Sequence, residues 1–71
     1  MPMKTKTKEG LKIIIKRNGW QVTGVFVKDF EMNATLMNEF EITSADENSP
    51  YKIGNTILIS QNELKYHKTI N

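Results

Sequence analysis

The chain has 71 residues, of which ten are Lys or Arg and eight are Asp or Glu, and it has no cysteine. This length is enough for one small domain with a marginal hydrophobic core, and the absence of cysteine excludes disulfides and thiolate zinc sites. No apolar run approaches the ~20 residues of a membrane-spanning helix, and the basic N-terminus lacks the apolar segment of a signal peptide. We therefore expect a soluble, cytoplasmic protein with no membrane partner.

Charge is unevenly distributed along the chain. Residues 1–17 carry six basic side chains against one acidic side chain, whereas residues 18–71 carry four against seven. Residues 1–10 show no hydrophobic period, so we expect a flexible basic arm there and a folded domain in residues 11–71. Such an arm indicates a polyanionic partner for one face of the domain, and a solubilising tail without a partner is the alternative.

The first folded segment predicts a β-hairpin. Asn18–Gly19 lies between two runs rich in β-branched residues, and a two-residue turn of this type pairs residues whose numbers sum to 37. The pairs on the apolar face are then Ile15 with Val22, Ile13 with Gly24, and Leu11 with Phe26. Because glycine inside a strand commonly marks a bend, we expect the second strand to curve sharply at Gly24.

The segment after Asp29 is also predicted to be a strand, followed by a loop in the turn-forming residues 43–52. The apolar residues that share one face of this strand are Met32, Ala34, Leu36, Phe40 and Ile42. Two further strands are predicted at residues 53–60 and 63–70. If Gln61–Asn62 is a two-residue loop between them, Ile59 faces Leu64 and Ile57 faces Tyr66.

These elements define an all-β fold class. No segment shows a convincing period of 3.6 residues, and the predicted strands are short and joined by polar turns. Five such strands predict a small, strongly bent five-stranded antiparallel barrel.

The sequence offers little for catalysis. His67 is the single histidine, and no glycine-rich phosphate loop or metal-ligand cluster is present. Asp29 and Glu31 lie close together, but paired carboxylates this near a turn are usually solvated. We therefore expect no enzymatic activity, no cofactor and no metal site, and a structural or exposed role for His67.

Two stretches resemble the motifs of the Sm-like protein family, and the resemblance extends over residues 11–70. Residues 18–36 resemble the first Sm motif, with Gly24, Phe26, Asp29, Met32, Asn33 and Leu36 at the matching positions. Residues 53–66 resemble the second, with Gly54, the apolar run Ile57–Ile59 and Leu64. The resemblance implies a highly bent five-stranded barrel, and the N-terminal arm is too short and aperiodic for the usual N-terminal helix of the family.

The resemblance also implies a homo-oligomeric ring of about five to seven subunits, in which the fourth strand of one subunit pairs with the fifth strand of the next. Such rings bind single-stranded RNA, here expected to be U-rich or A-rich. Asn33 would point from the loop between the second and third strands toward the central pore and read a base edge, because an amide offers both a donor and an acceptor. Met32 would face the barrel core, and Asp29 would brace the loop that carries Asn33 by accepting hydrogen bonds. From the local sequence alone, a left-handed turn residue without a ligand is the alternative for Asn33.

The chain departs from the family pattern at the expected base pocket. Glu31 stands where a stacking aromatic or histidine is usual, which makes the neighbouring Phe30 the candidate stacking ring. Ser60–Gln61 replaces the usual Arg-Gly, so Gln61 and Asn62 are candidates to supply hydrogen bonds instead of the arginine. The candidate RNA-binding residues are Asp29, Phe30, Glu31, Asn33, Ser60, Gln61 and Asn62.

The basic arm and Trp20 are further candidate contacts. Lys4, Lys6 and Lys8 would bind backbone phosphates in a manner that weakens steeply with salt. Trp20 could be an exposed stacking platform, and the alternative is a cap over the end of the barrel.

Two other functions stay open at the level of sequence. The departures at Glu31, Ser60 and Gln61 motivate a ring that has lost its base pocket and serves as a protein-interaction scaffold. The other hypothesis is a monomeric barrel of ribosomal or transcription-factor type.

Overall fold

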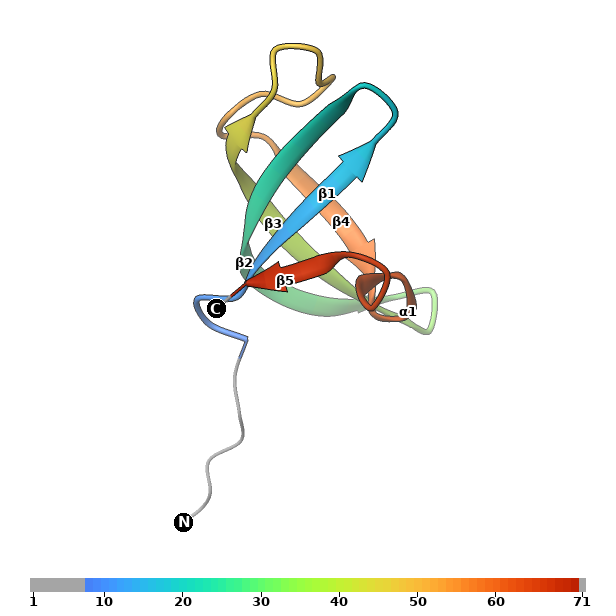
Figure 1. Cartoon of the computed structure of the whole chain (residues 1–71). Coiled ribbons are helices and arrows are strands. Elements are labelled where there is room, and N and C mark those ends of the chain that lie inside the picture. Colours follow the sequence, from blue (N-terminus) through green and yellow to red (C-terminus); the bar gives the residue numbers. More distant parts are fainter. Residues whose placement is uncertain (1–7, 71) are drawn as a thin grey trace.

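The computed structural model describes residues 8–70 of the chain and contains one antiparallel sheet and one short helix (Figure 1). The elements are β1 (Lys12–Arg17), β2 (Trp20–Met32), β3 (Thr35–Ala45), β4 (Thr56–Ser60), α1 (Gln61–Leu64) and β5 (Lys68–Ile70). The strands pair in the order β4-β3-β2-β1-β5, so β4 and β5 are the two edges. The five antiparallel strands are confirmed, whereas closure into a barrel and an Sm-like fold remain predictions. Within residues 8–70, no helix has the length and apolar character needed to cross a membrane.

The β1–β2 hairpin has the predicted register. Ile15 pairs with Val22 and Ile13 with Gly24. Just beyond the strand, the Phe26 amide donates to the Leu11 carbonyl at 2.8 Å. Gly19 in the turn has a φ of 87°, which glycine adopts without steric cost. The turn length and the apolar pattern specify the same pairing, and a slip of one residue would move every buried side chain to solvent.

β2 is the longest strand and bends along its length (Figure 1). Its pairing with β3 shifts register between Thr23 and Gly24 and again between Phe26 and Lys28. Bulges of this kind bend a strand and increase its twist. The curvature expected at Gly24 therefore coincides with irregular pairing at that position.

The β2–β3 turn interrupts the strand that the apolar alternation predicted, and it agrees with the loop implied by the resemblance and with the turn alternative for Asn33. Met32 pairs with Thr35, and the two residues between them, Asn33 and Ala34, have φ values of 51° and 64°. Two consecutive positive values are typical of a type I′ turn. The prediction that Ala34 shares a strand face with Leu36 is wrong, and Met32 is 41% exposed instead of facing the core. Alternation alone does not distinguish one strand from two strands joined by a two-residue turn.

Residues 46–55 connect β3 to β4, close to the predicted loop. β4 begins three residues later than expected, because Gly54 adopts a φ of 97° and turns the chain. The Gly54 amide donates to the Ile42 carbonyl at 2.9 Å, and the Ile42 amide donates to the Asn55 carbonyl at 2.8 Å. These two bonds fix the approach of β4 to β3.

The predicted hairpin of the last two strands is wrong. The residues after β4 form α1, and β5 pairs with β1 at the far side of the sheet, with Lys12 opposite Ile70. The Ser60 hydroxyl caps α1 by accepting the Glu63 amide at 3.2 Å. Ser followed three residues later by Glu is the spacing of a capping box. The helix directs the chain away from β4, so residues 61–62 are not a hairpin loop.

The core is built on one face of the sheet, here called the inner face. Its buried apolar side chains are Ile13, Ile15, Val22, Phe40, Ile42, Ile59 and Leu64. Phe26 packs edge-on against Phe40, with ring centroids 5.8 Å apart. Trp20 packs against this cluster and meets Tyr51 edge-on at 5.9 Å. These contacts favour the cap interpretation of Trp20.

Candidate functional site

The β2–β3 turn and the β4–α1 junction lie at the same end of the sheet (Figure 1). Met37, near the start of β3, pairs with Ser60, the last residue of β4. Asn33 is exposed in the turn, and its side-chain amide has no hydrogen bond to any described residue. The left-handed backbone fits the turn alternative for Asn33, while the exposed amide is available to a ligand.

Two neighbouring candidates lie on opposite faces of the hairpin. Phe30 pairs with Met37 on the outer face, and the Lys28 ammonium lies 5.8 Å from its ring centroid. Glu31 pairs with Leu36 on the inner face and is exposed. The hairpin end therefore presents a half-buried aromatic ring on one face and a negative charge on the other.

Ser60 and Asn62 differ in how far the fold uses their side chains. The Ser60 hydroxyl accepts the Glu63 amide as the cap of α1. Asn62 is exposed on α1, and its side chain makes no hydrogen bond with the described residues. Asn62 is therefore the freer of the two candidates.

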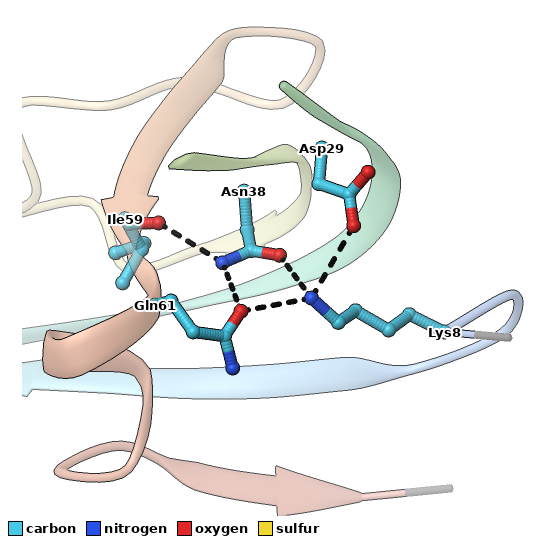
Figure 2. Close-up of polar contacts among 5 residues, drawn as sticks. All are labelled: Lys8, Asp29, Asn38, Ile59 and Gln61. Atoms are coloured by element: carbon cyan, nitrogen blue, oxygen red, sulfur yellow. Dashed lines mark hydrogen bonds and ion pairs between the residues drawn. The ribbon is translucent and has the colours of Figure 1, made fainter. Parts of the chain in front are cut away.

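A polar cluster forms beside this end of the sheet and joins the N-terminal segment to β2, β3 and α1 (Figure 2). The Lys8 ammonium donates to Asn38 Oδ1 at 2.7 Å and to Gln61 Oε1 at 2.9 Å, and it lies 3.4 Å from Asp29 Oδ2. Asn38 Nδ2 donates to the Ile59 carbonyl at 3.3 Å and to Gln61 Oε1 at 3.1 Å. We call Lys8, Asp29, Asn38 and Gln61 the Asn38 cluster. It brings together three of the predicted residues.

Asn38 is the member that the sequence interpretation missed. Its side chain is fully buried, and its amide oxygen and nitrogen both have partners. A buried amide without partners would be costly, so the cluster keeps this position compatible with the core. Asn38 alternates with Phe40 and Ile42 along β3, and this period of two places it on the inner face. That spacing was the signal in the sequence.

The predicted phosphate-binding lysines fall into two groups. Lys8 lies within the Asn38 cluster, and its ammonium also sits 5.7 Å from the centroid of the Phe26 ring. A phosphate at Lys8 would have to compete with these contacts. Lys4 and Lys6 lie outside the described residues, so their role stays a prediction.

His67 has a structural setting. Its side chain is nearly buried, and Nε2 lies 3.2 Å from Glu63 Oε2. The same carboxylate is 3.7 Å from the Arg17 guanidinium. Glu63 thus links the β1–β2 hairpin to the segment between α1 and β5.

Comparisons with protein-family models, with curated proteins and with solved structures found no match to this chain. The site must therefore be interpreted from its own geometry.

Proposed function

We propose that the protein is an Sm-like module that assembles into a homo-oligomeric ring and binds single-stranded, U-rich or A-rich RNA in cytoplasmic RNA metabolism. The observation that carries this proposal is the exposed Asn33 amide in a tight turn, at the same end of the sheet as Gln61 and Asn62. An unpaired amide in a tight hairpin turn suits recognition of base edges in a single strand.

The two sheet edges support assembly into a ring. β4 and β5 each have one unpaired side, and Leu58 on β4 and Ile70 on β5 are about 40% exposed. Pairing the β4 edge of one copy with the β5 edge of the next would satisfy both and could close a ring.

The charges near these edges are of opposite sign. Lys12 and Lys68 lie on the outer face of β1 and β5, because the residues that alternate with Lys12 are buried on the inner face. Glu39 and Glu41 lie on the outer face of β3, beside β4. In a contact between the two edges only β4 would separate β3 from β5 of the next copy, a distance of about 10 Å at ~4.8 Å per strand. Attraction between the acidic and basic side chains across β4 favours this orientation.

A protein-interaction scaffold is the second candidate function, and the Asn38 cluster gives it specific support. The Ser60 hydroxyl and the Gln61 oxygen are both used within the fold, and Glu31 adds negative charge beside the turn. Such a site offers RNA fewer free groups than a pocket with an arginine and a stacking ring.

Replacing Asn33 with glycine tests the RNA-binding role. Glycine accepts the positive φ of this position, so the substitution removes the amide and keeps the turn. We expect about tenfold weaker binding of the preferred homopolymer in titrations with labelled U-, A- and C-tract oligoribonucleotides in ~150 mM salt.

The matched control for this titration is Asn48→Gly, in the loop at the other end of the sheet beside Gly19. We expect it to leave affinity unchanged. Unchanged affinity in Asn33→Gly, or a wild type that binds every tract weakly and loses binding as salt is raised, would favour the scaffold.

Reversing the charge of Lys68 tests the assembly. We expect Lys68→Glu to weaken self-association by about threefold to tenfold, because it places a negative charge opposite the acidic side of the next copy. Native mass spectrometry and sedimentation would measure the change. Adding Glu39→Lys should restore association. A native mass of one 8.2 kDa chain in the wild type would instead exclude the ring.

A further inference from the structure

The Asn38 cluster fixes which way two amides point. A lysine ammonium has no acceptor, so the atoms of Asn38 and Gln61 that face Lys8 must be oxygens. The Asn38 nitrogen is then directed to the Ile59 carbonyl and to the same Gln61 oxygen. The Gln61 oxygen therefore accepts two hydrogen bonds, one from a charged donor and one from a buried amide.

The nitrogen of Gln61 is left for a ligand. Gln61 is exposed, and Nε2 makes no hydrogen bond with the described residues. Figure 2 shows this nitrogen directed away from the other members of the cluster. Rotating the amide would bring its N–H groups against the Lys8 ammonium and the Asn38 amide, which are themselves donors. Gln61 thus presents donors only.

A donor-only glutamine has a different base preference from a free one. A free glutamine pairs with adenine through both of its polar atoms, accepting from N6 and donating to N7. Gln61 lacks a free oxygen for that pairing. Uracil presents two carbonyl oxygens, and either one needs only a donor from the protein.

We propose that Gln61 is a specificity-determining residue that donates to a uracil carbonyl, with Lys8 and Asn38 as the positioning residues that hold its amide. This inference rests on the proposed RNA-binding function. It predicts that the Asn38 cluster makes the protein bind U-tracts more tightly than A-tracts. Three residue pairs, Phe30–Met37, Glu31–Leu36 and Met32–Thr35, separate Asn38 from the Asn33 turn along the hairpin. At ~3.3 Å per residue this is about 13 Å of strand, so one RNA strand of several nucleotides can reach both the Asn33 and the Gln61 amides.

The test is Gln61→Glu, with Gln21→Glu as the matched control. Gln61→Glu keeps an oxygen for Lys8 and Asn38 and removes both donors. Gln21→Glu makes the same chemical change at an exposed position of β2, beside the β1–β2 turn at the other end of the sheet. We expect Gln61→Glu to weaken U-tract binding about tenfold and A-tract binding much less, and Gln21→Glu to leave both affinities within about twofold of the wild type.

Gln61→Met is the second variant, because it removes the donors without adding charge. It should also lower the ratio of U-tract to A-tract affinity, and urea unfolding at the assay temperature would confirm that each variant is folded. The inference is overturned if Gln61→Glu binds both tracts as well as Gln21→Glu does, or if its losses are equal for the two tracts, as a phosphate contact would give. If the wild type binds no tract, the proposed RNA-binding function is wrong. If the wild type binds RNA but substitution of Gln61 changes neither affinity nor tract preference, only this inference is wrong.

Discussion

Replacing Asn38 with leucine is expected to lower the free energy of unfolding by about 2–3 kcal/mol, because several polar groups lose a partner at once. Leucine has the same number and branching of side-chain heavy atoms as asparagine and leaves no cavity, so the cost comes from the lost hydrogen bonds. The Lys8 ammonium would lose its shortest contact, at 2.7 Å, and the Ile59 carbonyl would lose its contact with Nδ2. The Gln61 oxygen would also lose the hydrogen bond from Asn38 Nδ2 and keep only the one from Lys8.

Urea unfolding followed by circular dichroism would measure this effect. The matched control is Asn48→Leu, because Asn48 is exposed and makes one side-chain hydrogen bond, at 3.4 Å, to the Gly19 carbonyl. We expect its free energy of unfolding to stay within about 0.5 kcal/mol of the wild type. Equal or greater stability in Asn38→Leu would show that the core prefers an apolar residue there, as some buried polar groups allow.

The part of the fold that could be predicted from the sequence is the part that local chemistry determines. Asn18–Gly19 sets a two-residue turn, and the turn sets every pair of β1 and β2. The two bulges between β2 and β3 were not predictable in the same way, because no turn or capping residue marks where an extra residue enters the ladder. The extra residue is Thr43 of β3 in one and Val27 of β2 in the other. They depend on how β2 and β3 pack around the core.

The region after β4 was predicted wrongly although a local signal was present. The apolar residues of 63–70 fit a strand paired with β4, whereas the Ser60–Glu63 spacing entered no prediction. In the structure the cap starts a helical turn, and the chain then pairs with β1. A four-residue helix is too short to give a period of 3.6, so the cap was the only signal of it.

The candidate site shows a similar division. Asp29, Lys8 and Gln61 were each named from the sequence, but in separate roles as a loop brace, a phosphate contact and a base contact. Asp29, Asn38 and Gln61 all contact the Lys8 ammonium. Asn38 lies far in sequence from Lys8 and Gln61, and it is opposite Asp29 only because β2 and β3 pair. Pattern matching along the chain could not join them, since the contact is made across four elements.

Replacing Gly24 with alanine is expected to destabilise the fold by about 1–3 kcal/mol. A Cβ atom at Gly24 would lie 3.0 Å from Phe40 Cβ and 3.7 Å from Phe40 Cγ. Glycine-to-alanine changes usually stabilise by about 0.4–1 kcal/mol where the backbone permits, because the unfolded chain loses freedom. Here the clash should outweigh that gain. Phe40 is fully buried and packs edge-on against Phe26, so it has little room to move.

A double-mutant cycle with Phe40→Leu separates the clash from other causes. Each variant should lower the free energy of unfolding measured in urea. Their combination should cost less than the sum of the two, because leucine keeps the Cβ atom but removes the buried ring that holds residue 40 in place, so that this Cβ atom can shift away from the new methyl group. The bend of β2 at Gly24 carries the hairpin toward the end where Asn33 and Gln61 lie. Additive losses would mean that Gly24 is needed for the irregular pairing of β2 and not for the close approach of Phe40.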